Sequence, residues 1–192
     1  EVTTLSLVPG SEQEQRIAIS NPLLADTSHL RTNLWEEHLQ ICVRNLKASQ
    51  RGCSVFEIGN TYSGSPEAVS QTAVLGGVIC GDRRLSTWAT SGKPQAPDYF
   101  QARGVLTRVM EALQLELSDR RLIDDARLHP GRAATLVLEG RPLGCFGQLH
   151  PAVAEELDLP EATYLFELDL VRLLDAATRS NRWTPSFKPY PT

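Results

Sequence analysis

The sequence predicts an α+β protein with an antiparallel sheet flanked by helices. The helices are expected to pack on one face of the sheet. Two observations support this prediction. Most strand-like stretches alternate apolar and polar residues and follow one another through short turns, and the helix-like stretches are inserted between them at irregular intervals. A doubly wound α/β fold would require a regular alternation of strand and helix, which this sequence lacks.

The first half of the chain is expected to contain four strands and one helix. The helix follows a cap at Thr27-Ser28 and ends near residue 50, before Arg51-Gly52. Residues at three- or four-residue spacing form its expected buried stripe: Leu30, Leu34, His38, Ile41 and Asn45. The four strands are expected at residues 1–8, 15–20, 54–62 and 71–80, the last two joined by the turn at 63–66.

The second half is expected to begin with a loop at residues 86–97 and a helix at about 98–115. The apolar stripe predicted for this helix consists of Phe100, Val105, Val109, Ala112 and Leu113. Further strands are expected at 119–128, 133–139, 143–149 and 163–169, and helices at 151–157 and 170–178. In the strand near residue 56, alternation predicts that Phe56 and Ile58 face the core, while Glu57 and Gly59 face the other side.

Composition excludes several classes of protein. The net charge of −4 and the scattering of the 19 basic residues argue against a domain that binds nucleic acid on its own. No apolar run approaches the roughly 20 residues that cross a bilayer. The four cysteines are scattered without a CxxC pair, which is typical of reduced core thiols in a cytoplasmic protein.

General catalytic and metal-binding motifs are absent from the sequence. The four histidines are far apart, and there is no GxSxG, P-loop or GxGxxG pattern. His129 and His150 each precede a proline, so we expect them at turns, bonded to backbone groups. Gly76-Gly77 lies within a strand pattern and indicates a close backbone approach. We therefore predict no catalytic, cofactor-binding or metal-binding residue in this chain.

A series of ordered segments resembles the beta chains of bacterial phenylalanine–tRNA ligases, which carry NPL, LRTSL, FEIG and DFF-x-x-KG motifs in this order. The resemblance spans nearly the whole chain. It rests on Ile19-Ser20-Asn21-Pro22-Leu23, Leu30-Arg31-Thr32-Asn33-Leu34, Asn45, Val55–Tyr62, Asp98–Gly104, His129–Ala134, Gly144–Pro151 and Phe166–Leu170.

The resemblance implies a class II aminoacyl-tRNA synthetase-like fold. It also implies that residues 1–182 form a catalytic-like module and that the proline-rich residues 183–192 are a linker toward a C-terminal domain that is absent here. The implied partner is the catalytic alpha subunit, in an (αβ)2 assembly that uses ATP and magnesium to attach phenylalanine to tRNA. This module would meet tRNA only through that assembly.

The resemblance also implies that this module is inert. Class II active sites hold ATP with an arginine in an aromatic-Arg-x-Glu motif and another in a Gly-x-Gly-x-x-Arg motif, because guanidinium groups neutralise phosphate charge. Phe56-Glu57-Ile58-Gly59 lacks the first arginine. In Phe166–Arg172, Glu167 and Asp169 stand where the second motif has its two glycines. Arg172 either occupies the position of the arginine of that motif or is a plain surface residue.

Three residues are candidates for a subunit interface: Asn21, Pro22 and Arg31. Asn21-Pro22 is equally well explained as a plain strand end. Arg31 has three possible roles, namely a contact with the alpha subunit, an internal brace or a solvated helix residue. Two other functions remain open for the chain, a stand-alone adenylate-forming enzyme and a tRNA-binding module.

Overall fold

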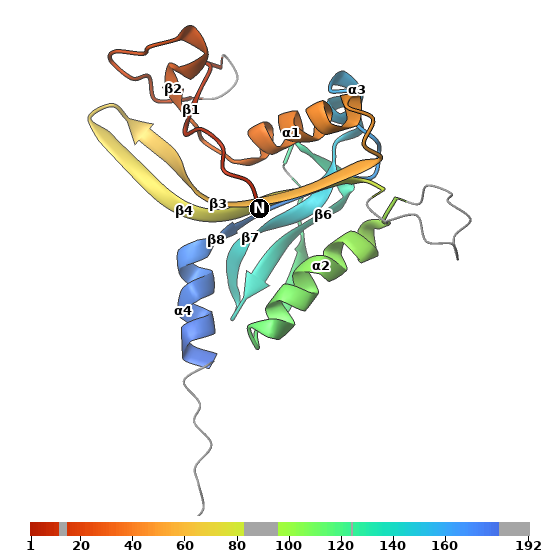
Figure 1. The fold of residues 1–192 in the computed structure, drawn as a ribbon. Helices are drawn as coiled ribbons and strands as arrows, with labels where there is room; N and C mark the ends of the chain where they lie inside the picture. Colours follow the sequence, from red (N-terminus) through yellow and green to blue (C-terminus); the bar gives the residue numbers. More distant parts are fainter. Residues whose placement is uncertain (12–14, 83–95, 124, 181–192) are drawn as a thin grey trace, which may run out of the picture.

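The computed structural model describes residues 1–11, 15–82, 96–123 and 125–180. Its main element is a six-stranded antiparallel sheet in the order β3-β4-β8-β7-β6-β5 (Figure 1). These strands are β3 (Gly52–Ser65), β4 (Ala68–Gly81), β5 (Leu117–Arg121), β6 (Leu128–Leu138), β7 (Arg141–Leu149) and β8 (Thr163–Asp169). The expected linker at 183–192 and most of the expected loop at 86–97 lie outside the described residues.

The last strand joins the two parts of the sheet. β8 pairs with β4 on one side and with β7 on the other, so the long β3–β4 hairpin and the β5–β6–β7 meander form one sheet. Every pairing in this sheet is antiparallel. The predicted α+β class with an antiparallel sheet is therefore confirmed.

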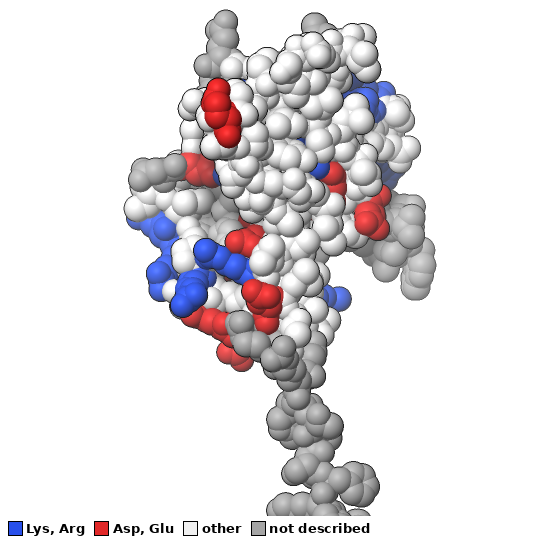
Figure 2. Space-filling model, turned by 90° about the vertical axis from the view of Figure 1, so that its left-hand side faces the viewer, with Lys and Arg blue, Asp and Glu red and all other residues white. Residues whose placement is uncertain are grey.

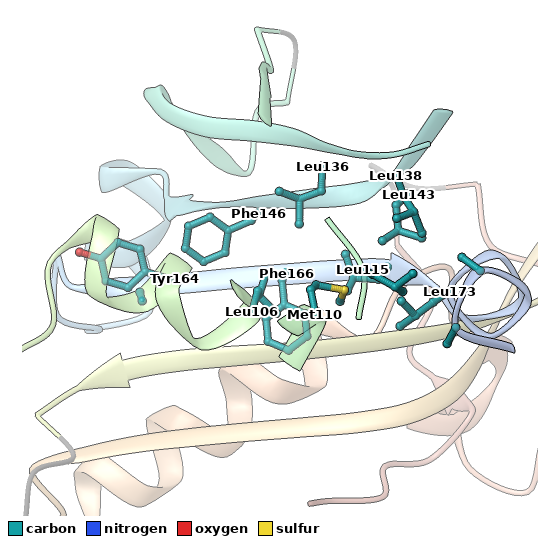
Figure 3. Close-up of a cluster of buried hydrophobic side chains, with 14 of the residues drawn as sticks. Leu106, Met110, Leu115, Leu136, Leu138, Leu143, Phe146, Tyr164, Phe166 and Leu173 are labelled. Atoms are coloured by element: carbon teal, nitrogen blue, oxygen red, sulfur yellow. The ribbon is translucent and has the colours of Figure 1, made fainter. Parts of the chain in front are cut away.

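Helices cover both faces of the sheet, so the expectation of helices on one face is wrong. α1 (Trp35–Lys47) and α3 (Pro151–Glu156) pack on one face, and α2 (Tyr99–Ala112) and α4 (Leu170–Ser180) pack on the other. The physical reason lies in β8, whose successive residues Tyr164, Leu165 and Phe166 are all apolar and buried. A strand that is apolar at consecutive positions must be covered on both faces. Figure 3 shows the core on the α2 side, around Phe146 and Leu136.

The apolar stripe predicted for α2 is wrong. Asp98 caps this helix, since its carboxylate accepts a hydrogen bond from the Gln101 N–H at 2.7 Å. The stripe that faces the sheet is Ala102, Leu106 and Met110, whereas Phe100, Val105, Val109 and Ala112 are exposed and Leu113 is half-buried. The helix carries two apolar stripes, and sequence periodicity alone does not decide which of them packs on the sheet.

The N-terminal region is less regular than predicted. Instead of strands at 1–8 and 15–20, the short strands β1 (Leu7–Val8) and β2 (His29–Leu30) pair with each other, and Ala18 forms an isolated bridge with His29. Because β2 takes residues 29–30 and the 3₁₀ helix Ala25–Thr27 precedes it, α1 begins only at Trp35. Asn33 Oδ1 then serves its first turn by accepting the Glu36 N–H at 3.2 Å.

The region around residue 128 also differs from the prediction. β5 ends at Arg121, and the expected turn at His129-Pro130 lies inside β6, where the register shifts between Leu128 and Ala133. The expected bonding of the histidines to backbone groups is confirmed, because His129 Nδ1 accepts the Gly131 N–H at 3.0 Å and His150 Nδ1 accepts the Ala152 N–H at 3.2 Å. The expected position at a turn is wrong for His129, which lies within β6. None of the helices in the described part of the chain is long and apolar enough to cross a membrane.

Candidate functional site

A buried ion pair lies beneath the start of α1. Glu57 on β3 is 2% exposed, and its Oε1 lies 3.1 Å from the Nη1 of Arg31. His38 on α1 is fully buried, with its Nε2 3.2 Å from Glu57 Oε2. Thr4 completes the cluster by donating its N–H and its hydroxyl to the same carboxylate oxygen at 3.1 and 2.7 Å. Thr4, Arg31 and His38 therefore all contact the carboxylate of Glu57.

This arrangement reverses the orientation predicted for β3. Phe56 and Ile58 were expected to face the core, yet they are 42% and 56% exposed, and Glu57 points under α1. The alternation itself was correct. The prediction was wrong because it assumed that the apolar side of the strand is the covered side, whereas α1 covers the side that carries the carboxylate.

The cluster determines the charge states of its members. Burial alone would raise the pKa of Glu57, but the hydrogen bonds from Thr4, the charge of Arg31 and the contact with His38 together lower it. Burial lowers the pKa of His38, although the contact with Glu57 opposes this change. Because a carboxylate only accepts, His38 Nε2 carries the proton, and its buried Nδ1 has no hydrogen-bond partner among the described residues.

The cluster is built to hold the fold rather than to react. Arg31 also donates its Nε–H to the Asn60 carbonyl at 2.8 Å and its Nη1–H to the Thr4 hydroxyl at 2.7 Å. Glu57 and His38 are enclosed by protein, so a substrate has no access to either. The structure therefore places Arg31 inside the module, in the position of an internal brace.

Glu167 and Asp169, the two carboxylates near residue 168, both serve helix starts. Glu167 Oε2 accepts the Leu34 N–H at 3.4 Å, just before α1. Asp169 Oδ1 accepts the Arg172 N–H at 3.0 Å at the start of α4. Negative groups at helix N-termini are favourable because the helix dipole is positive there. Arg172 lies on the surface, pairs with Asp169 at 3.2 Å and donates to the Pro142 carbonyl at 2.7 Å.

A second cationic group on the α1 side of the sheet is also engaged. The Arg127 guanidinium donates its Nε–H to Asp125 at 2.7 Å and lies 5.5 Å from the centroid of the Trp35 ring. The hydrogen bond and charge of Asp125 raise the pKa of Arg127, although burial opposes this. Burial raises the pKa of the neighbouring Cys145 to about 11. An arginine held in this way is not available to a phosphate group.

An apolar groove lies on the opposite face of the sheet, between α2 and the strands β3, β4 and β8. Its volume is about 730 Å³. Apolar side chains predominate in its lining, and the polar members are Glu1, Ser54 and Gln101. Among the residues that the structure describes, its lining includes no lysine or arginine to bind a triphosphate. A smaller cavity of about 140 Å³ near Arg141 and Arg172 lies below the roughly 300–1,000 Å³ that small-molecule sites occupy.

The N-terminal lobe, defined as residues 15–30, exposes a short apolar tip. Its two sides are joined by the Ile19 N–H, which donates to the Ser28 carbonyl at 2.9 Å, and by the Ala18–His29 bridge. At the tip, Asn21 and Pro22 are exposed, Leu23 is 96% exposed and Leu24 is 66% exposed. In Figure 1 the lobe projects from the α1 side, away from the main sheet.

Comparison with known proteins identifies the family. Residues 2–170 match the family described as the phenylalanyl tRNA synthetase beta chain CLM domain. The chain belongs to this family. The beta-chain module is 97% identical over 192 residues to the phenylalanine–tRNA ligase beta subunit of Synechococcus sp. (strain CC9605) and 77% identical to that of strain CC9902. It spans about a quarter of the length of these relatives, 24% in each case.

The fold also resembles solved synthetase structures. A pyrrolysyl tRNA synthetase from Desulfitobacterium hafniense superposes with a TM-score of 0.60 at 16% identity, covering 94% of this chain and 60% of that one. A second structure of that enzyme gives a TM-score of 0.61 at 14% identity. The beta-chain module therefore has the predicted class II synthetase-like fold.

Sequence reasoning identified some site residues and missed others. Asn21 and Pro22 are exposed, whereas Arg31 is buried beside Glu57. Thr4 and the pairing of His38 with Glu57 were missed. One available signal was a charged residue between two apolar residues in a strand, and another was a histidine on the apolar stripe of a helix. Within the described residues, no three His, Cys, Asp or Glu side chains gather to hold a metal ion.

Proposed function

We propose that the beta-chain module is a non-catalytic scaffold that binds the alpha subunit of phenylalanine–tRNA ligase. In this role it supports an (αβ)2 enzyme that attaches phenylalanine to tRNA in the cytoplasm. ATP and magnesium act in the assembled enzyme and not in this chain. Residues 1–182 form the module, and 183–192 connect it to a further domain.

The observation that carries the proposal is the exposed tip of the N-terminal lobe. Leu23 at 96% exposure and Leu24 at 66% lie side by side at the end of a hydrogen-bonded lobe. Adjacent exposed apolar side chains, with polar neighbours such as Asn21, are typical of interaction surfaces. Asn21 and Pro22 are therefore proposed as interface residues together with the two leucines, whereas Arg31 supports the fold behind them.

The absence of catalysis by this module is supported by the state of its charged groups. Arg31 and Arg127 are bound to Glu57 and Asp125, and the described residues that line the large groove include no cationic side chain. A site that stabilises an adenylating transition state needs guanidinium or metal charge directed at phosphate oxygens. The stand-alone adenylate-forming alternative lacks that feature.

A nucleotide titration tests this part of the proposal. Full-length beta subunit, alpha subunit and their mixture are titrated with ATP and magnesium in a calorimeter. We expect no heat of binding with beta alone and saturable binding with the mixture. Micromolar binding by beta alone would overturn the inert-module proposal in favour of the adenylate-forming enzyme.

The tRNA-binding alternative predicts steeply salt-dependent binding. Figure 2 shows basic and acidic groups side by side on one face of the molecule, below a broad uncharged area. Such a face does not concentrate positive charge for a phosphate backbone. Electrophoretic shifts with tRNA at about 50 and 200 mM salt, where the salt dependence of phosphate contacts is large, separate the two functions. Tight binding by the beta subunit alone at low salt would favour the tRNA-binding module.

A further inference from the structure

Three of the four cysteines gather between α1 and the β3–β4 hairpin. Cys42 on α1 and Cys80 on β4 are fully buried, and Cys53 on β3 is 9% exposed. Cys53 and Cys80 lie directly opposite each other on the two strands. The Cys42 thiol is hydrogen-bonded to both of the others. The fold therefore brings together three thiols that are scattered in the sequence, and the cluster around Glu57 does not use them.

Within this thiol cluster, Cys80 is the sulfur best suited to react. Its hydrogen bond with Cys42 lowers the pKa of Cys80 to about 7, although burial opposes the change and Thr163 adds to it. The Thr163 hydroxyl lies 3.3 Å from the Cys80 Sγ and 2.7 Å from the Pro160 carbonyl oxygen. Its single proton can therefore turn toward the sulfur when the thiol ionises. The ionised form matters because the thiolate is the nucleophile in cysteine chemistry.

Cys42 is placed to complete a reaction that begins at Cys80. The hydrogen bond with Cys80 and burial both raise the pKa of Cys42, so this thiol keeps its proton and donates it to the Cys80 sulfur. Two sulfurs within hydrogen-bond reach need only small side-chain rotations to approach the S–S bond length of about 2.05 Å. The two residues belong to different elements, α1 and β4, so a bond between them would tie the helix to the sheet.

Cys53 is less well placed to bond with Cys80. The Phe56 carbonyl and the Tyr62 N–H are bonded to segments outside the main sheet, so the even positions of β3 direct their backbone groups away from β4. The odd positions, including Cys53, then exchange both ladder hydrogen bonds with their partners on β4. Side chains in such pairs lie farther apart than those in the alternate pairs. The register therefore favours Cys42 as the partner of Cys80.

The thiol cluster lies near the end of the hairpin where β3 begins and β4 ends. Cys53 is the second residue of β3, and Cys80 is the last but one of β4. Beyond them, the Asp82 N–H donates to the Arg51 carbonyl at 3.1 Å. The ends of strands open locally at a lower free energy than the middle of a sheet. A small uncharged oxidant such as hydrogen peroxide can enter through an opening of that size.

We propose that Cys42 and Cys80 form a reversible disulfide site in the beta subunit, oxidised by hydrogen peroxide and reduced by a dithiol. The Cys80 thiolate attacks one peroxide oxygen, the O–O bond breaks, and the leaving hydroxide takes up the proton that the thiol released. Cys80 is then a sulfenic acid. The Cys42 sulfur attacks the Cys80 sulfur, the S–O bond breaks, and the hydroxyl leaves as water with the Cys42 proton. Two thiols are thereby oxidised to one disulfide, and one peroxide is reduced to two waters.

Peroxide treatment of the full-length beta subunit tests the proposal. The reduced protein is treated at a pH near 7, the pKa of Cys80. Remaining thiols are blocked with N-ethylmaleimide in denaturant, and an unreduced digest is analysed by mass spectrometry. We expect a pair of peptides joined through Cys42 and Cys80 that separates after treatment with dithiothreitol. Recovery of both residues as free thiols after peroxide would overturn the site, and a disulfide between Cys53 and Cys80 would overturn the pairing.

Cys145 is the matched control within the same chain. It is less buried than Cys80, but burial raises its pKa to about 11, so little of it is thiolate near neutral pH. Cys80 should therefore lose its free thiol at least about tenfold faster than Cys145. Equal rates would contradict the proposal, because they would show that the thiol cluster adds no reactivity.

Two variants separate the roles of the other thiols. Cys53→Ala should still form the disulfide between Cys42 and Cys80. Cys42→Ala should form no disulfide at Cys80, and the Cys80 sulfenic acid should be trapped by dimedone. A Cys80 disulfide in Cys42→Ala would contradict the assignment. The mapping on the unmodified sequence does not require either variant to fold, and it is independent of the alpha subunit.

Discussion

Arg31 and Glu57 form an ion pair at 3.1 Å in which both side chains are almost completely buried, at 3% and 2% exposure. The pair connects the segment before α1 to the strand β3, and Thr4 attaches the N-terminal stretch to the same carboxylate. It lies on the sheet face under α1, opposite the groove. The module thus uses its most buried charges to hold its own elements together.

Glu57→Gln should therefore destabilise the protein strongly. The substitution keeps the shape of the side chain but leaves the Arg31 guanidinium buried without a counter-charge, which costs about 3–5 kcal/mol. Urea unfolding followed by circular dichroism measures the change in the free energy of unfolding. Glu67→Gln, at the exposed tip of the β3–β4 hairpin, is the matched control and should leave the midpoint unchanged. A loss below about 1 kcal/mol for Glu57→Gln would show that the pair contributes little.

The same cluster predicts a loss of stability in acid. The pKa values of His38 and Glu57 are both lowered by folding, so the unfolded chain binds protons first as the pH falls. The contribution of His38 is complete above its ordinary value of 6.5 and is lost as the pH falls toward its lowered pKa. The contribution of Glu57 is lost only below about 4.5.

His38→Gln tests this assignment, because glutamine can still donate a hydrogen bond to Glu57 but does not titrate. Unfolding free energies of both proteins are measured from pH 7.5 to 4. The wild-type protein should lose stability relative to the variant as the pH falls below about 6.5. Parallel curves below that pH would show that His38 does not cause the decrease.

Gly77→Ala should be destabilising because no space exists for a side chain. A Cβ at Gly77 would lie 2.6 Å from the Phe166 ring and 2.6 Å from the Val55 carbonyl oxygen. Gly104→Ala is the matched control, since nothing lies within 4 Å of its Cβ and it sits inside α2. It should stabilise the protein by roughly 0.5–1 kcal/mol, because alanine favours helix. Thermal melts should shift in opposite directions, and a common direction would contradict the packing described here.

The core around Phe146 should be sensitive to truncation. Phe146 is fully buried and stacks on Tyr164, with ring centroids 6.2 Å apart (Figure 3). Phe146→Ala should cost about 3–5 kcal/mol. Phe100→Ala, on the 80% exposed side chain of the same residue type, should change stability by less than about 0.5 kcal/mol. Equal effects in urea titrations would contradict the burial of Phe146.

The sequence predicted the class of fold better than the orientation of its faces. Turn residues and alternation placed most strands of the main sheet within a few residues. Which face was covered could not be deduced, because the answer depends on where α1 and α2 pack. The same uncertainty caused the errors at Phe56, Ile58 and Val105, since each lies on an apolar stripe that this part of the chain leaves uncovered.

Short strands and long-range polar contacts were also beyond sequence reasoning. β1 and β2 have two residues each, and they depend on contacts that a local pattern does not encode. The contact between Thr4 and Glu57 spans 53 positions in the chain. The family motifs predicted a module without ATP-binding arginines, but the binding of Arg31 to Glu57 became visible only when the fold placed them together.

The central claim is that the N-terminal lobe binds the alpha subunit, and co-purification of the two subunits tests it most directly. Tagged beta subunit carrying Leu23→Asp and Leu24→Asp is co-expressed with alpha, beside wild-type beta and an Ile123→Asp control. Both leucines are exposed, so the variant should fold normally and retain at least about tenfold less alpha, equivalent to 1.4 kcal/mol. Retention of alpha at wild-type levels by a folded double variant would contradict the account.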